Sequence, residues 1–397
     1  MKSSAAFGVK AAADSLTRRW LFQLLFFGIV ALSFTLLFHG TVYPSPTSSL
    51  RVKLNGSPPV VAEEQSAASD FPRRSFPTPV LQDESSSSET AVVASDPPPE
   101  TQEMRLERVL RAAATPDKTV IMTSLNAFWS TPGSVLDVFL ESFRIGDGTT
   151  ALLDHLVIVA VDDKAYERCL AVHRHCFDFK VPGVDFSSEK IFNTPEYLDM
   201  MWARLDFLRL VLEKGFNFVF SDVDVMWFRN PLPFFYEDGD FQISCDNFFG
   251  DPTNMKNWPN NGFNYARSNS RTIEFFKYWH ASRARFPSVH EQNVLNIIKY
   301  EQHVRDIGVQ IRFLSTERFG GICEPSRDFN KVCTMHANCC IGLNKKINDL
   351  RAMLDDWRKF MALSLDQRIS SHVSWSVPQS CRLPPGFFSK EEKKPQL

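Results

Sequence analysis

Two aspartates at the end of an apolar stretch are the residues of this sequence best suited to chemistry. Residues 216–231 read FNFVFSDVDVMWFRNP, so a predicted strand runs directly into Asp222 and Asp224. Residues i and i+2 of an extended backbone point to the same side, which brings both carboxylates to one point past the strand end. Two such oxygens suit a hard divalent cation, Mn²⁺ or Mg²⁺, that keeps positions open for phosphates. A solvated strand end is the alternative, but the apolar flanks favour acids that have partners.

Alternating strands and helices are expected to position these acids. Strands are expected at residues 120–125, 156–161, 216–220, 241–244 and 309–314, and helices at residues 134–144, 196–214, 271–285, 291–300 and 347–363. This alternation predicts an α/β fold with a mixed, mostly parallel sheet flanked by helices. Ligands of such sheets bind at the carboxyl ends of the strands, and the two aspartates occupy that position.

A 19-residue apolar stretch near the N-terminus predicts a membrane anchor. Residues 20–38 carry no charge, and the preceding residues 1–19 hold four basic side chains against one acidic one. This charge bias predicts that residues 1–19 stay cytosolic and that the rest of the chain is translocated, as in a type II signal anchor. A cleaved signal peptide is disfavoured, because its apolar region is shorter and ends at a small-x-small site.

The remaining chain divides into a stem, one large domain and a tail. Residues 39–115 are rich in proline and serine and predict a disordered stem, although residues 101–113 have the composition of a short helix that joins the stem to the domain. Residues 116–385 are long enough for one catalytic domain, and residues 386–397 form a flexible tail. Asn55 lies in a glycosylation sequon weakened by the proline that follows it.

The charge balance and the cysteines exclude some classes of protein. The formal net charge is −2, so a basic nucleic-acid binder is excluded. All eight cysteines follow the predicted anchor and would enter an oxidising lumen, where disulfides persist, but eight cysteines leave their pairing open. Zinc binding by Cys169, His173, His175 and Cys176 is disfavoured, because oxidation competes and the spacing is irregular.

Several long segments in order resemble a known family. They include TVIMTSLNAFW, FVFSDVDVMWFRNP, FQISCDNFFG, NGFNYARSN and CTMHANCCIGL, within residues 118–362. This part of the chain resembles the plant nucleotide-diphospho-sugar transferase domain of glycosyltransferase family 77. The resemblance implies a GT-A-like fold, an Asp-x-Asp metal motif, type II Golgi topology and a retaining reaction. Known members transfer pentoses or galactose, including arabinose to hydroxyproline-rich glycoproteins and xylose to pectin.

The resemblance implies roles for residues near the acids. Asp224 would bind the metal directly, and Asp222 would contact ribose and reach the metal through water. His336 would complete the metal sphere, with a buried core histidine as the alternative, and its imidazole favours Mn²⁺ over Mg²⁺. Thr123, Ser124 and Asn126 end the first strand and are the expected base and ribose contacts. Arg204 is expected either to contact a phosphate or to form a surface salt bridge.

Two further carboxylates and several amides are candidates for sugar and acceptor contacts. Asp246 and Glu291 are the candidate catalytic carboxylates near the anomeric carbon. A first-turn helix acid is the alternative for Glu291, and the family has Asp-Gln where this chain has Glu291-Gln292. The other expected substrate contacts are Asn247, Asn261, Gly262 and Gln292. Front-face attack and double displacement both stay open as the retaining mechanism.

These expectations combine into one function. The sequence predicts a metal-dependent, retaining glycosyltransferase in the Golgi membrane that moves a pentose or galactose from a UDP-sugar to a cell-wall glycan or glycoprotein. A non-catalytic, membrane-anchored lectin or scaffold is the main alternative. A phosphohydrolase is disfavoured, because in those enzymes the Asp-x-Asp motif lies early in the domain, whereas here it lies in the middle.

Overall fold

The computed structural model describes residues 100–181, 186–187, 193–370 and 372–382. All of them belong to one compact unit, Val92–Leu397. The predicted anchor, most of the predicted stem, Asn55 and the predicted tail lie outside the described residues. Within the described residues, no helix is both long and apolar enough to span a membrane.

The folded part starts earlier than the predicted domain boundary at residue 116. Helix α2 (Gln102–Ala113) begins at Thr101, whose side chain accepts a hydrogen bond from the Met104 backbone N–H. Its residues Leu106 and Leu110 are buried against the main sheet's core. The short helix predicted here is therefore confirmed, but it is part of the domain and not of a disordered stem.

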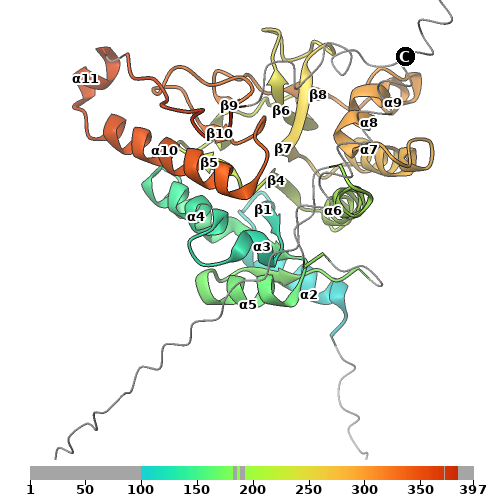
Figure 1. Cartoon of the computed structure of the whole chain (residues 1–397). Coiled ribbons are helices and arrows are strands. Elements are labelled where there is room, and N and C mark those ends of the chain that lie inside the picture. Colours follow the sequence, from blue (N-terminus) through green and yellow to red (C-terminus); the bar gives the residue numbers. More distant parts are fainter. Residues whose placement is uncertain (1–99, 182–185, 188–192, 371, 383–397) are drawn as a thin grey trace, which may run out of the picture. The chain divides into compact units, whose positions relative to one another are not determined.

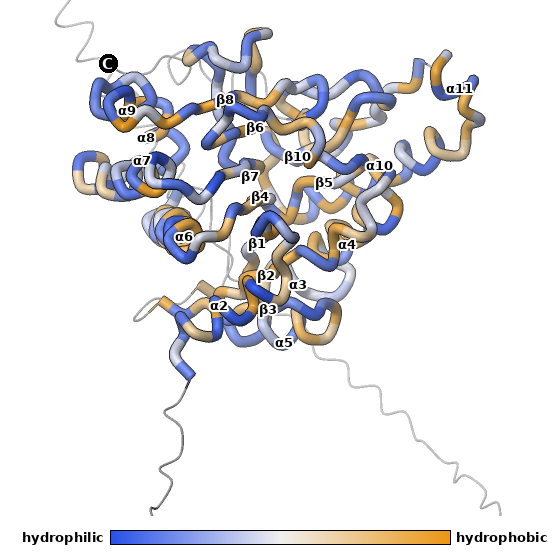
Figure 2. The backbone as a smooth tube through the Cα atoms, turned by 180° about the vertical axis from the view of Figure 1, so that it is seen from behind, coloured by the Kyte–Doolittle hydropathy of each residue, from blue (hydrophilic) through white to orange (hydrophobic). Residues whose placement is uncertain are grey.

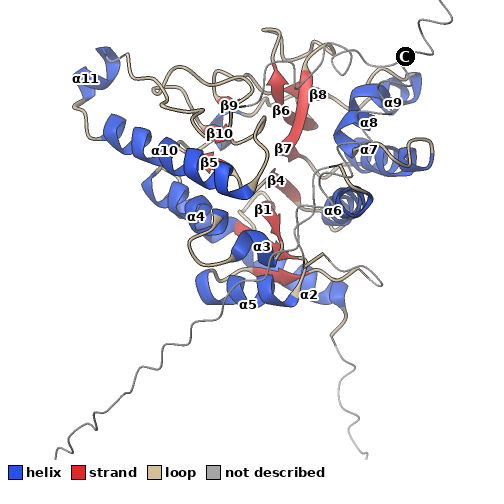
Figure 3. Cartoon of the chain, viewed as in Figure 1, coloured by secondary structure: helices blue, strands red, loops and turns tan. Residues whose placement is uncertain are grey.

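A seven-stranded sheet forms the centre of the domain (Figure 3). Its strands, in spatial order, are β3 (Cys176–Asp178), β2 (Leu156–Ala160), β1 (Thr119–Leu125), β4 (Asn217–Ser221), β7 (Trp258–Ala266), β6 (Phe241–Asn247) and β8 (Ile311–Phe313). The first four are mutually parallel, β7 is antiparallel to both of its neighbours, and β6 is parallel to β8. The predicted mixed, mostly parallel sheet is confirmed, but β7 was not predicted as a strand.

A second, three-stranded sheet lies beside the first. It has the order β5 (Val225–Trp227), β10 (Thr334–His336), β9 (Phe319–Gly321). Strand β10 is antiparallel to β5 and parallel to β9. Because β5 follows β4 after only three residues, the segment Asp222–Asp224 connects the two sheets.

Helices cover both faces of the main sheet (Figure 1). They are α3 (Ala127–Ser130), α4 (Val135–Ile145), α5 (Asp163–Val172), α6 (Pro195–Glu213), α7 (Ser270–Ala281), α8 (Glu291–Ile298), α9 (Gln302–Ile307), α10 (Leu343–Met361) and α11 (Leu365–Ser370). One core packs α4, α10 and the small sheet, and the other packs α2, α6, α7 and α8. Along the helices hydrophobic and hydrophilic residues alternate, as expected for helices with one face on a core (Figure 2).

Local sequence signals at both ends of helix α6 explain why its predicted boundaries agree with the structure. Thr194 caps its first turn by accepting a hydrogen bond from the Tyr197 N–H, and Pro195 occupies the first helical position, where it needs no backbone partner. Gly215 ends it with a φ of +82°, a conformation that favours glycine. The helix therefore has a fixed start and end, and it presents Arg204 from its middle to the sheet edge.

Three disulfides join six of the eight cysteines, all of which lie in the described part of the chain. The pairs are Cys169–Cys176, Cys323–Cys339 and Cys340–Cys381. Cys245 and Cys333 are buried thiols. Because Cys169 and Cys176 bond to each other, they are not zinc ligands, in agreement with the preference against a zinc site.

Candidate active site

The two aspartates and His336 form a compact group at the junction of the two sheets. Asp222 and Asp224 follow β4, and His336 ends β10, which pairs with β5 so that His336 lies opposite Val225. One ligand atom from each of the three side chains lies within 4.8 Å of the others. The Nε2 atom of His336 is 3.2 Å from Asp224 Oδ1 and 4.0 Å from Asp222 Oδ2. The structure thus brings together the three residues predicted to bind a metal.

Strand β7 approaches this group so closely that a side chain would not fit. The Asp222 N–H donates to the Gly262 carbonyl at 2.6 Å. A Cβ atom on Gly262 would lie 2.3 Å from His336 Cε1 and 2.8 Å from Asp222 Oδ2. The sequence predicted Gly262 as a substrate contact, and the structure shows its backbone close to Asp222 and His336.

A lysine from α10 supplies a positive charge to the same group. The Lys346 Nζ atom donates to Asp224 Oδ2 at 2.5 Å. Burial acts to raise the pKa of Asp224, but Lys346 and His336 outweigh it and hold the pKa of this carboxyl well below its usual range. Burial acts to lower the pKa of His336, yet Asp224 raises it. No local sequence signal shows this contact, because the two residues lie 122 positions apart.

A buried arginine holds the other aspartate. Arg204 NH1 donates to Asp222 Oδ1 at 2.7 Å, and its NH2 donates to Glu291 Oε1 at 2.9 Å. The guanidinium also lies 4.8 Å from the centre of the Phe220 ring. The salt bridge expected as one alternative is present, but it is a buried link between two carboxylates and not a surface pair.

Glu291 has a different place from the one predicted. It begins α8 and is fully buried, at 0% exposure. Burial acts to raise the pKa of Glu291, but His290 and Arg204 outweigh it and depress the pKa. Its Oε1 also accepts a hydrogen bond from Asn261 Nδ2 at 3.1 Å. A carboxylate enclosed in this way does not reach a sugar, so the first-turn helix acid, the alternative for Glu291, is the correct interpretation of its position.

The second candidate carboxylate, Asp246, is surrounded by amides. Its Oδ1 accepts hydrogen bonds from Asn338 Nδ2 at 2.8 Å and from Asn260 Nδ2 at 2.9 Å. Its Oδ2 has one longer contact, 3.5 Å, with Gln292 Nε2. Burial raises the pKa of Asp246, while His336 and the amides oppose this rise. Asp246 is half-buried and therefore accessible, unlike Glu291.

The other predicted substrate contacts differ in accessibility. Asn247 is exposed at the end of β6, and Ser124 is partly exposed on β1. The Thr123 hydroxyl is fully buried and faces the interior. Asn126 caps α3 and donates to the Phe186 carbonyl at 3.0 Å. The Asn261 backbone N–H donates to Gln292 Oε1 at 2.8 Å. The side chains of Thr123, Asn126 and Asn261, which were predicted to bind substrate, are thus buried in the protein or hydrogen-bonded to it.

The three clustered side chains fit a divalent cation. Two carboxylates and an imidazole are a donor set suited to Mn²⁺ and similar ions. The Lys346 ammonium, seated on Asp224, shows that this position attracts a cation. The His336 Nδ1 atom is buried and has no hydrogen-bond partner among the described residues, whereas Nε2 faces the two aspartates.

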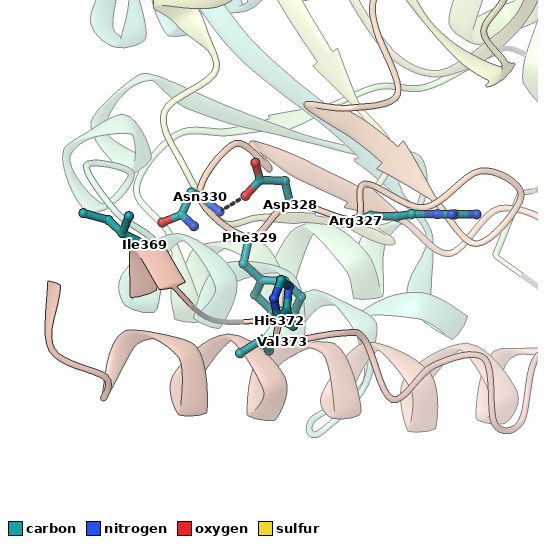
Figure 4. A pocket seen from close by; sticks show the side chains of 7 residues that line it. All are labelled: Arg327, Asp328, Phe329, Asn330, Ile369, His372 and Val373. Carbon is teal, nitrogen blue, oxygen red and sulfur yellow. Dashed lines mark hydrogen bonds between the residues drawn. The ribbon is translucent and has the colours of Figure 1, made fainter. Parts of the chain in front are cut away.

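A cavity of about 470 Å³ lies elsewhere in the domain (Figure 4). It is lined by residues 327–330 and by Ile369, His372 and Val373. Its one drawn hydrogen bond joins the Asn330 backbone N–H to Asp328 Oδ1. Asp222, Asp224 and His336, which we call the metal-binding group, do not line this cavity, so it is separate from the candidate site.

Comparison with known proteins identifies relatives of this chain. A sequence model of the nucleotide-diphospho-sugar transferases matches residues 151–350. An uncharacterized protein of Arabidopsis thaliana is 47% identical over 280 residues, which are 70% of this chain and 73% of the relative. A beta-arabinofuranosyltransferase of the same plant is 42% identical over 66 residues, 16% of this chain and 12% of the relative.

A solved structure is also similar. Mouse xyloside xylosyltransferase 1 matches 56% of this chain and 98% of its own, with a TM-score of 0.35 and 14% sequence identity. Likeness at this TM-score does not establish a shared fold, so the relationship rests on the sequence matches.

Proposed function

This chain belongs to the nucleotide-diphospho-sugar transferase family and is a glycosyltransferase, and from this premise we propose that it moves a pentose or galactose from a UDP-sugar, with retention of configuration, to a cell-wall glycan or glycoprotein. The observation that carries the proposal is the convergence of Asp222, Asp224 and His336 within 4.8 Å at the carboxyl end of β4. The short match to a beta-arabinofuranosyltransferase supports a pentose.

The metal-binding group serves the donor diphosphate. A divalent cation held there, Mn²⁺ in preference to Mg²⁺, supplies Lewis-acid neutralisation of the charge that builds on the leaving diphosphate. Asp224 and His336 would hold the cation, and Arg204 fixes the Asp222 carboxylate through Oδ1, so that Oδ2, on the His336 side, would serve the cation and the ribose. Lys346 keeps Asp224 ionised and adds positive charge beside the diphosphate.

Asp246 is the carboxylate that faces the reacting sugar. Its Oδ1 is held by two amides, and Oδ2 is the atom with room for a sugar hydroxyl or the reacting centre. Asn247, exposed beside it, is suited to bind sugar or acceptor hydroxyls. Glu291 acts further back, by holding Arg204 and Asn261 in place.

We place the enzyme in the Golgi membrane, with a type II anchor at residues 20–38 and the catalytic domain in the lumen. Three disulfides in the described part of the chain support an oxidising compartment. The uncharged stretch with basic residues on its N-terminal side supports the orientation.

The proposal is tested with purified full-length enzyme and a panel of UDP-sugars. Release of UDP is measured with Mn²⁺, with Mg²⁺ and with a chelator, alone and with pentoside or galactoside acceptors. We expect Mn²⁺-dependent turnover of one donor class and retention at the anomeric carbon by NMR. Asp206→Asn, at a half-exposed acid on α6 that pairs with Arg209, is the control variant and should keep full activity. Binding of sugars without metal-dependent turnover of any donor would support a lectin and refute a transferase.

A further inference from the structure

One short segment connects the metal-binding group to Asp246. His336 ends β10, and Asn338 follows two residues later. The Ala337 N–H donates to the Asp224 carbonyl at 3.0 Å, and the Ile322 N–H donates to the His336 carbonyl at 2.9 Å. The segment is thus fixed to the acidic loop on one side and to the chain after β9 on the other.

The two ends of the Asn338 amide contact two different residues, Asp246 and Cys323. Its Nδ2 donates to Asp246 Oδ1 at 2.8 Å, and its Oδ1 accepts from the Cys323 N–H at 3.0 Å. The side chain is 8% exposed. A Cβ atom on Gly321 would lie 2.4 Å from Asn338 Oδ1, so only glycine at position 321 leaves room for the amide. These contacts give Asn338 a single orientation.

Two disulfides begin immediately after Asn338. Cys339 bonds to Cys323, the residue whose N–H holds the Asn338 oxygen, and Cys340 bonds to Cys381. The Cys381 end is secured in turn by the buried Asp349, which accepts hydrogen bonds from the backbone N–H groups of residues 379–381. Adjacent cysteines in two different disulfides restrain this part of the chain from two directions.

The consequence at Asp246 is an asymmetric carboxylate. Two donors under 3 Å fix Oδ1, whereas Oδ2 has only the 3.5 Å contact with Gln292 in the described part of the chain. Loss of the Asn338 donor would leave Oδ1 with Asn260 as its one remaining short contact, so the carboxylate would turn more freely about its Cβ–Cγ bond and the direction of Oδ2 would be less defined. Orientation errors of this kind reduce the rate of a reaction more than they reduce binding.

We propose that Asn338 is a positioning residue for glycosyl transfer, which directs Asp246 Oδ2 at the sugar of the donor whose diphosphate the metal-binding group serves. We propose further that the Cys323–Cys339 disulfide keeps Asn338 in place. This inference rests on the proposed function, because it assigns the reacting sugar to the side of Asp246. It assigns a role in the reaction to one residue and one disulfide that do not themselves bind the metal.

The test compares three variants of the full-length enzyme in UDP release from its donor. Asn338→Asp keeps the side-chain size but replaces the donor with an oxygen that faces Asp246. The second variant, Cys323→Ser with Cys339→Ser, removes the disulfide, and the third combines both changes. Cys169→Ser with Cys176→Ser is the matched control, since that disulfide lies between α5 and β3.

The inference predicts a specific pattern of constants. Asn338→Asp lowers kcat at least about tenfold, while the donor KM and the apparent Mn²⁺ constant change less than about threefold. Removal of Cys323–Cys339 gives the same kcat-selective loss, and the combined variant is no slower than Asn338→Asp, because both act through one contact. The control variant has a lower Tm and an unchanged kcat.

Each contrary result has its own meaning. An unchanged kcat in Asn338→Asp overturns the inference and leaves the proposed function intact. If the loss of kcat in the combined variant equals the product of the two separate losses, the disulfide does not act through Asn338. The second part of the inference then fails. Absence of metal-dependent turnover in the wild-type enzyme refutes the proposed function and the inference with it.

Discussion

The two halves of the main sheet contrast in how they are built and in what they contribute. Strands β3, β2, β1 and β4 are parallel, and the disulfide of this half joins α5 to β3 between cysteines seven residues apart. The half with β7, β6 and β8, together with the small sheet, mixes parallel and antiparallel strands and has disulfides that span 16 and 41 residues. Asp222 and Asp224 lie at the border, and most side chains that hold or surround them come from the second half or from α10. The first half mainly supports the sheet, and the second half supplies most of the close contacts to the two aspartates.

The largest effect is expected at the border itself. Asp224→Asn keeps the shape of the side chain but removes the charge that Lys346 and His336 share. We expect Mn²⁺-dependent turnover to fall by about a thousandfold or more, because loss of a metal ligand removes the neutralisation of the leaving group. UDP release at saturating donor, over a range of Mn²⁺ concentrations, measures the change. Activity within tenfold of wild type would show that the cluster is structural.

Two glycines, one in each half, give a sharper test of the contrast. Gly262→Ala in β7 places a Cβ 2.3 Å from His336, so the imidazole must move and kcat should fall about a hundredfold. Gly215→Ala follows α6 in the first half, where a Cβ meets nothing within 4 Å but φ is +82°. That variant should lose about 1 kcal/mol of stability and keep its kcat. Equal losses of kcat in the two variants would contradict the division of roles.

The elements and contacts of the molecule differ in how far the sequence could predict them. Apolar runs and helix caps predicted β1, β2, β4 and α6 of the first half within a few residues, and they did the same for β6, β8, α7, α8 and α10. Asp222 and Asp224 were found because their i, i+2 spacing is local. Strand β7 was not predicted, because its sequence, WPNNGFNYA, is rich in asparagine, which is uncommon in strands. In the folded protein these amides form hydrogen bonds with other side chains, which the sequence does not show.

The remaining site residues depend on distant partners. Asn338 contacts Asp246 across 92 residues, and Lys346 contacts Asp224 across 122. Glu291 pairs with Arg204, 87 residues away. No periodicity or cap encodes such pairs, so the sequence gives their residue types but not their contacts. His336 was identified only through resemblance to a family, since its strand has three residues.

A smaller effect is expected where the halves meet through Arg204. Glu291→Gln leaves the guanidinium with Asp222 as its one remaining carboxylate, at a cost of about 3 kcal/mol at pH 7. The pKa of Glu291 is depressed in the folded protein, so its stabilisation is complete above the unfolded pKa near 4.5 and is lost as pH falls below it. Urea unfolding between pH 3 and 7 should therefore show a shallower acid decline in Glu291→Gln. Glu213→Gln, at a half-exposed surface pair, is the control and should match wild type within about 0.5 kcal/mol.

The smallest effect on function is expected at a buried charge of the second half that lies away from the acids. Lys299 is 3% exposed, and its Nζ donates to the Asn257 carbonyl at 2.7 Å and to Asn296 Oδ1 at 2.9 Å. Burial lowers the pKa of Lys299 to about 8 from 10.5. Between these values the unfolded chain binds more protons than the folded one, so stability rises with pH, by about 1.5 kcal/mol from pH 8 to 9.5.

Lys299→Met should abolish that rise and leave kcat at neutral pH within about twofold of wild type, because the ammonium contacts no member of the metal group. Urea unfolding at pH 8.0 and 9.5 measures the first effect, and UDP release measures the second. The difference between wild type and variant isolates Lys299 from the tyrosines and thiols that also titrate. A large loss of kcat would mean that the chain around Asn257, which Lys299 holds, belongs to the site, and the region of close contacts in the second half would then extend beyond the segment from His336 to Lys346.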